Sequence, residues 1–178
     1  MGVRNLVRLE TRSATSGGCN EITIRDLIKT ALRMRPDRII VGEVRGEEAI
    51  DMLQAFNVGQ DGSLSTIHAN SAKDAISRLE TMVMLSTRIP MEALRRQIAS
   101  GVDIIIHLGR LRDKSRHVLE IAETVMTDDD KIETRTLYRF VETGETDGRI
   151  EGKLVMENGL LRKDKLIPSQ APCTALPG

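Results

Sequence analysis

Apolar and polar residues alternate with two different periodicities along the chain, and each periodicity predicts a different kind of secondary structure. In the first part, apolar residues recur at intervals of three and four, as in Ile24, Leu27 and Ile28, which is typical of a helix with one buried face. Short apolar runs between these stretches indicate strands. We therefore expect helices at residues 23–35, at 47–56, from 71 onward and at 90–100, with strands at 5–11, 38–43 and 63–68.

Polar residues and a proline mark the ends of these predicted helices. Thr23 and Asp26 have the spacing of a capping box, in which each side chain satisfies backbone N–H groups of the first turn. Ser71 and Asp74 repeat that spacing at the start of a later helix. Pro36 forbids continuation of the first helix and favours an extended residue before it.

After residue 101 the pattern becomes that of strands. Residues 102–108 are strongly apolar, 116–126 and 132–141 are longer and amphipathic, and 150–156 follow, with turns expected at 128–131 and 144–148. Helix–strand alternation that gives way to a strand meander predicts an α/β core followed by antiparallel strands. The strand at 38–43 is apolar at its centre, as expected for a parallel strand covered on both faces.

Composition narrows the classes of function. The 178 residues include 26 basic and 26 acidic side chains, so the chain has no net positive charge that would attract nucleic acid or an anionic membrane. Aromatic residues make up 2% of the chain and tryptophan is absent, so the chain lacks the aromatic side chains on which proteins that bind single-stranded nucleic acid stack the bases. The two cysteines, Cys19 and Cys173, have no metal-ligand spacing, and a reducing compartment is the simpler reading. We expect a cytoplasmic protein that does not bind nucleic acid directly.

Candidate chemistry lies where two of the predicted strands end. Glu43 is the last residue of the strand expected at 38–43, and His68 is the last residue of the strand expected at 63–68. Taken alone, Glu43 could be a surface carboxylate, Arg45 could simply pair with it, and His68 could be structural. The repeated order of strand, polar residue and helix favours a shared site, because ligands collect at the carboxyl ends of parallel strands.

These two segments resemble a known family. Residues 35–46, RPDRIIVGEVRG, resemble the Walker B segment of the secretion ATPase superfamily, and residues 62–71, GSLSTIHANS, resemble its His box. Members of that superfamily are hexameric motors of type II and type IV secretion, type IV pili and conjugation. The resemblance covers roughly residues 3–127 and is closest to the tight-adherence pilus branch.

The resemblance implies a RecA-like fold and ATP hydrolysis with Mg²⁺. Glu43 matches the Walker B glutamate, which helps to hold the magnesium and its water shell, and Arg45 matches the arginine after it. His68 matches the histidine that couples nucleotide state to conformation. Arg8 and Arg12 fall where the superfamily tends to place arginines that reach phosphate, including across a subunit interface.

The family pattern also implies an organisation and partners. Residues 1–110 are expected to form the C-terminal part of the ATPase core, 111–167 an antiparallel extension of the same domain, and 168–178 a disordered tail. A hexameric ring is implied, together with an inner-membrane secretion or pilus platform protein and a location at the inner face of the cell membrane.

One family feature is missing from the sequence. No Gly-x-x-x-x-Gly-Lys-Ser/Thr phosphate loop occurs, and in the family it lies upstream of the matched segment. We therefore expect the chain to be part of a motor subunit and to hydrolyse negligible ATP alone. The alternative is a non-catalytic assembly or interaction module that retains the packing surface of the fold.

Five other features favour structural roles. Met82 and Met84 are expected at the core and its edge, His107 inside an apolar strand, and His117 on a solvated strand. Residues 128–130 are three acids that lack the alternating spacing of a calcium loop and predict a turn. Residues 110–116 predict a solvated basic turn, with a subunit contact as the alternative.

Overall fold

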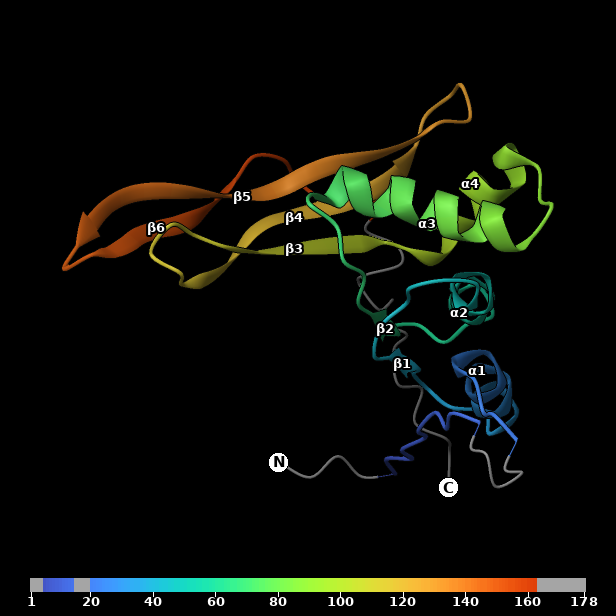
Figure 1. Ribbon diagram of the computed structural model, residues 1–178. Helices are drawn as coiled ribbons and strands as arrows, with labels where there is room; N and C mark the ends of the chain where they lie inside the picture. The colour runs from blue at the N-terminus through green and yellow to red at the C-terminus, as the bar shows by residue number, and fades with distance from the viewer. Residues whose placement is uncertain (1–4, 15–19, 163–178) are drawn as a thin grey trace, which may run out of the picture.

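The computed structural model describes residues 5–14 and 20–162 of the chain. Its elements are α1 (Ile24–Arg33), β1 (Ile40–Val41), α2 (Glu48–Phe56), β2 (Leu64–Ser65), α3 (Ala72–Ser86), α4 (Met91–Gly101), β3 (Ile104–Arg110), β4 (Arg116–Met126), β5 (Ile132–Thr146) and β6 (Arg149–Met156). Figure 1 shows α3 and α4 lying against the long sheet, with α1, α2 and the short strands β1 and β2 below them. The chain thus combines α/β units with an antiparallel sheet, as the sequence predicts.

The helices begin where their polar residues predict. The N–H of Asp26 donates to Thr23 Oγ1 at 3.2 Å and the N–H of Thr23 donates to Asp26 Oδ2 at 3.0 Å, so this capping box is confirmed. The N–H of Asp74 donates to Ser71 Oγ at 3.0 Å, so Ser71 caps α3, but this is only half of the capping box that the spacing predicts. Arg35 was expected to be extended but has a φ of 52°, because it closes the end of α1 with a hydrogen bond from its N–H to Leu32 O.

The first sheet is shorter than the sequence predicts. β1 and β2 pair in parallel through Ile40 with Leu64 and Val41 with Ser65. The prediction that the strand at 38–43 is covered on both faces is wrong, because Ile40 is 71% exposed while Val41 is buried. Residues 5–11 form no strand, and the neighbouring contact is a single bridge between Arg12 and Ile22.

The second sheet is antiparallel, in the order β3-β4-β5-β6. β5 runs beyond its predicted end, and the turn predicted at 144–148 is confined to Asp147 and Gly148, whose φ angles are 51° and 71°. Positive φ at both residues gives a tight hairpin whose twist matches the strands, which explains why pairing continues to the turn. A register shift between Glu142 and Gly144 accommodates the extra length.

The core lies where α2, α3 and α4 meet. Leu53 of α2, Val83 of α3, and Leu94 and Ile98 of α4 are fully buried. None of the helices in the described ranges 5–14 and 20–162 is long and apolar enough to span a bilayer. This core holds α2 and α3 against the loops that carry the predicted site, since those loops directly precede the two helices. The division of the chain at residue 110 remains a prediction.

Candidate functional site

Glu43 and His68 lie together just beyond the ends of β1 and β2. Parallel pairing of the two strands directs both residues to one edge of the sheet, and His68 Nε2 lies 2.8 Å from Glu43 Oε1. Two hydrogen bonds beyond the strands hold the segments together: the N–H of Val44 donates to Thr66 O at 3.0 Å, and the hydroxyl of Thr66 donates to Gly42 O at 2.6 Å. These bonds hold the two segments side by side, so Glu43 and His68 leave the sheet at the same edge.

Arg45 holds the other oxygen of the Glu43 carboxylate. Its Nε and terminal nitrogen lie 2.7 and 2.6 Å from Glu43 Oε2. Glu48 supports the turn, because its Oε1 accepts hydrogen bonds from the N–H groups of Arg45 and Gly46. Glu43 Oε1 is buried and accepts no aligned hydrogen bond within the described part of the chain, and the imidazole of His68 lies beside it.

Nearby cations favour the ionised form of Glu43. The hydrogen bond from Arg45, then its charge and those of His68 and Arg78, lower the carboxyl pKa from its ordinary value of 4.5, against the effect of burial. A folded-state pKa below the unfolded value stabilises the fold above pH 4.5, and this contribution falls as the pH drops through the folded pKa. Glu43 is therefore a carboxylate at neutral pH.

Replacing Arg45 by Gln is expected to raise the pKa of Glu43 toward 4.5, since Arg45 supplies the largest stabilisation of the charged form. A carboxyl-carbon NMR titration of the 178-residue chain measures this shift directly. Arg88→Gln removes an equal charge from an exposed position outside the site and is the matched control. An unchanged Glu43 pKa in Arg45→Gln would show that the ion pair does not form in solution.

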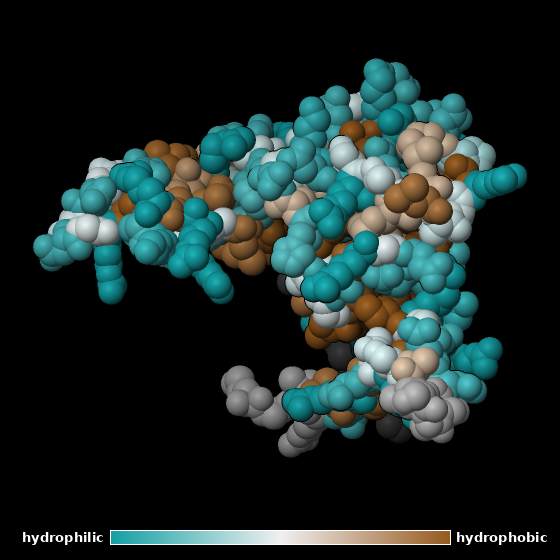
Figure 2. Space-filling view, in the orientation of Figure 1, coloured by the Kyte–Doolittle hydropathy of each residue, from teal (hydrophilic) through white to brown (hydrophobic). Residues whose placement is uncertain are grey.

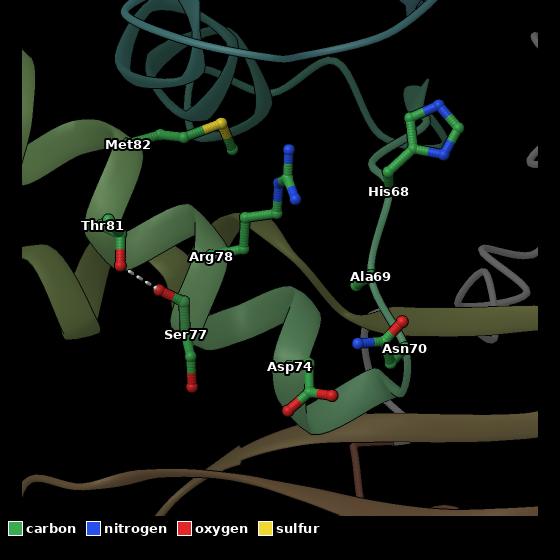
Figure 3. Close-up of a pocket in the computed structure, with 8 residues that line it drawn as sticks. All are labelled: His68, Ala69, Asn70, Asp74, Ser77, Arg78, Thr81 and Met82. Atoms are coloured by element: carbon green, nitrogen blue, oxygen red, sulfur yellow. Dashed lines mark hydrogen bonds between the residues drawn. The ribbon is translucent and has the colours of Figure 1, made fainter.

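A pocket of about 440 Å³ opens beside His68 and is lined by one face of α3. Figure 3 shows Arg78 extending from α3 on the side of the pocket where His68 lies, with Asp74 and Asn70 at the other end. Arg78 was not among the residues predicted for the site. The spacing of polar residues in the sequence could have indicated it, because Asp74, Arg78 and Thr81 lie four and three residues apart and form one exposed face of the helix.

The structure does not join the predicted N-terminal arginines to this site. Arg12 donates its guanidinium hydrogen bonds to Asn20 O at 3.3 and 3.1 Å, and its backbone pairs with Ile22. Arg8 is exposed. Within the described residues, no contact links either arginine to Glu43. Their role at phosphate remains a prediction.

Several structural expectations can also be checked. Met82 is buried and Met84 is half exposed, which confirms their place at the core and its edge. His117 was expected on a solvated strand, but it is half-buried against Phe140, with ring centroids 5.0 Å apart. Cys19, Cys173 and the tail 168–178 lie outside the described residues.

The acidic turn is held by ion pairs within the chain. Asp129 accepts hydrogen bonds from Thr127 and Lys131, which lower its pKa to about 2. Asp130 pairs with Arg96 of α4 at 3.1 Å. Within the described ranges, no group of three or more His, Cys, Asp or Glu side chains could hold a metal ion.

Most of the chain is similar in sequence to known proteins. A family model described as type II/IV secretion system protein matches residues 7–165. The chain is 43% identical over 118 residues to a putative conjugal transfer protein of Mycobacterium tuberculosis, which covers 66% of this chain and 33% of that protein. It is 38% identical over 109 residues to the type IV secretion system protein PtlH of Bordetella pertussis, which covers 60% of this chain and 32% of that protein.

A solved structure gives the same relationship in three dimensions. The VirB11 ATPase of the Brucella suis type IV secretion system, in complex with sulphate, superposes with a TM-score of 0.53 and 32% identity. The match covers 57% of this chain and 32% of that chain. The chain thus spans about one third of the length of the relatives that it matches.

Proposed function

Since the chain belongs to the type II/IV secretion system protein family, we propose that it forms one wall of the ATP site of a secretion motor. The contact between Glu43 and His68 at the ends of two parallel strands carries this proposal. The same proposal includes a RecA-like core, membership of the tight-adherence pilus branch and assembly into a hexameric ring. It also includes a platform protein as partner and a location at the inner face of the membrane. The match to a solved secretion ATPase supports it.

Glu43 is the residue that we assign to the metal's water shell. Its Oε1 has no aligned donor, so it can accept a hydrogen bond from a metal-bound water when the exposed His68 side chain moves off it. Arg45 occupies Oε2 and thereby fixes the rotation of the carboxylate. ATP would supply the phosphoryl group, and Mg²⁺ would neutralise the negative charge that develops during its transfer.

His68 is the residue that we assign to coupling. Its side chain is 79% exposed and contacts Glu43 at 2.8 Å, so it can exchange that contact for one to a nucleotide phosphate without breaking the core. Arg78 lies on α3 at the same pocket and adds positive charge beside it. Arg8 and Arg12 are proposed to reach a neighbouring subunit's phosphate, because their own subunit offers them no described contact to Glu43.

The chain lacks the phosphate cradle that this chemistry needs. No Walker A sequence is present, and phosphate loops supply backbone donors and a lysine to the phosphates. Glu43 fits a role at the metal's water. Single phosphate contacts are assigned to His68, Arg8 and Arg12, but none of them replaces the glycine-rich loop and lysine of a phosphate cradle. We therefore expect ATP hydrolysis only when another segment supplies that cradle.

ATP turnover by two proteins tests the proposal. The 178-residue chain alone is expected to hydrolyse Mg²⁺·ATP at the rate of buffer. A chimera of VirB11 that carries the matched segment of this chain in place of its own is expected to hydrolyse ATP. VirB11 itself is the positive control, with sedimentation and circular dichroism to verify folding and assembly. A folded, assembled chimera without activity would support the non-catalytic alternative.

A further inference from the structure

The pocket beside His68 carries two opposite charges that do not pair with each other. Asp74 and Arg78 both line it, and both belong to α3 with a spacing of four residues. That spacing, with the acid first, is one at which neighbouring side chains on a helix normally form an ion pair. Within residues 20–162, however, no hydrogen bond or ion pair holds the guanidinium of Arg78 or the carboxylate of Asp74. Both charged groups are therefore available to a ligand.

Arg78 turns away from Asp74 and toward the Glu43–His68 pair. Figure 3 shows its side chain extending to the side of the pocket where His68 lies, while Asp74 and Asn70 lie at the other end. The charge of Arg78 acts on Glu43, because it helps to lower the pKa of that carboxyl from 4.5. The pocket thus begins beside the candidate site and continues along α3, with a volume of about 440 Å³.

The hydroxyl groups on this face of α3 offer acceptors rather than donors. Thr81 Oγ1 donates to Ser77 O at 2.9 Å, and Ser77 Oγ donates to Lys73 O at 3.5 Å. Since each hydroxyl proton is used within the helix, only oxygen lone pairs remain for a ligand. Figure 2 shows hydrophilic side chains over α3 and apolar side chains in the hollow below it. The pocket therefore suits a small hydrophilic ligand that accepts hydrogen bonds from Arg78 and donates one to an oxygen of the pocket.

We propose that this pocket binds inorganic phosphate and holds it after ATP hydrolysis, a role that rests on the function proposed above. At neutral pH, free phosphate retains at least one P–OH proton beside its charged oxygens. The charged oxygens accept hydrogen bonds from the guanidinium of Arg78, and the P–OH donates to the carboxylate of Asp74. Sulfate has a similar shape and charge but no proton to donate, so the carboxylate of Asp74 only repels it.

The position of the two charges suits a phosphate that leaves the site. Side chains four residues apart on a helix begin about 5–6 Å from each other, a span that one phosphate ion covers with a hydrogen bond on each side. Arg78 lies at the end of the pocket near His68, and Asp74 lies at the other end. A phosphate released beside Glu43 therefore reaches Arg78 first and then bridges to Asp74, which moves its charge away from the Glu43 carboxylate.

An NMR titration of the 178-residue chain with sodium phosphate and with sodium sulfate tests the proposal in the absence of ATP. The pH is kept neutral and the ionic strength is held constant with sodium chloride. Amides of residues 70–81 are expected to shift saturably with phosphate. The affinity for phosphate is expected to exceed that for sulfate by about tenfold or more, since only phosphate gains a hydrogen bond to a charged group.

Substitutions on α3 separate the two charged groups. Arg78→Gln is expected to weaken phosphate binding by about tenfold or more, because charge-assisted hydrogen bonds are lost. Asp74→Asn is expected to bind sulfate as well as phosphate, because an amide does not repel sulfate and can donate to it. Lys73→Gln removes an exposed charge of α3 that does not line the pocket, so both affinities should stay within about twofold of the parent. Circular dichroism verifies that each variant is folded.

Equal affinity of the parent chain for phosphate and sulfate, or no saturable shift at residues 70–81, would overturn the proposal. Unchanged phosphate binding by folded Arg78→Gln, or continued exclusion of sulfate by Asp74→Asn, would do the same. These outcomes are separate from those of the proposed function. An inactive chimera together with the expected phosphate binding would contradict the ATP site alone, whereas an active chimera together with no phosphate binding would contradict this pocket alone.

Discussion

Replacing Glu43 by Gln in the VirB11 chimera is expected to lower kcat for ATP hydrolysis by about 100-fold or more, the usual effect of removing one group that acts on transition-state charge. The amide keeps the size of the carboxylate but loses its charge, so it releases Arg45 and binds a metal-held water less well. The KM for ATP should change much less, since the phosphate cradle comes from elsewhere. Steady-state kinetics at saturating Mg²⁺ measure both constants.

Glu47→Gln is the matched control for this experiment. Glu47 lies four residues from Glu43, and its side chain is 63% exposed and contacts Arg25 rather than His68. The same change in charge should therefore leave kcat within about twofold of the parent, because exposed ion pairs contribute little. Equal losses in both variants would mean that the net charge of the loop matters and not the position of Glu43.

Replacing Glu123 by Ala is expected to destabilise the chain by about 3 kcal/mol, because charged hydrogen bonds contribute about 1.5–3 kcal/mol each. Glu123 is 1% exposed, and its two oxygens accept the N–H groups of Leu161 and Arg162 at 3.0 and 2.7 Å. The carboxylate thus ties the segment after β6 to the middle of the sheet. Urea unfolding gives the free energy, and hydrogen exchange reports whether residues 161–162 lose protection.

Glu133→Ala provides the comparison for this change. Glu133 is exposed on β5 of the same sheet, so its truncation should alter the free energy of unfolding by less than about 0.5 kcal/mol. If both variants lose the same stability, the effect belongs to strand propensity rather than to the buried carboxylate. Loss of stability in Glu123→Ala without faster exchange at 161–162 would also contradict the assigned role.

Local signals in the sequence predicted much of the fold. Thr23, Asp26 and Pro36 delimit the first helix because capping and the missing proline N–H act within a few residues. The alternation of apolar and polar residues likewise predicted β4 and most of β5. The neighbouring positions of Glu43 and His68 could be inferred because two strand–helix units in succession favour parallel pairing.

What the sequence did not reveal depends on contacts between distant segments. The exposure of Ile40 depends on how many strands flank β1, and the half-burial of His117 depends on Phe140 from another strand. The extension of β5 follows from pairing with β6 through a register shift. Arg78 belongs to no motif, and it enters the site only because α3 packs beside the loop of His68.

A groove of about 820 Å³ between β2 and β3 likewise depends on distant segments. Its two walls are 40 residues apart in sequence, from Leu64 to Ile104, and each reads separately as an ordinary strand. Their shared hollow exists only because α2 and α3 form a floor beneath both. Apolar runs in a sequence predict that strands are buried, but they do not say which partner buries them.

Glu43 is proposed to serve the metal's water in an ATP site completed by other polypeptide. A structure of the chimera with Mg²⁺ and a non-hydrolysable ATP analogue is the sharpest test of this role. It should show a magnesium-bound water within hydrogen-bond distance of Glu43 Oε1, with Arg45 still on Oε2. Magnesium and phosphates bound away from residues 43 and 68, with Oε1 still facing His68 alone, would contradict it.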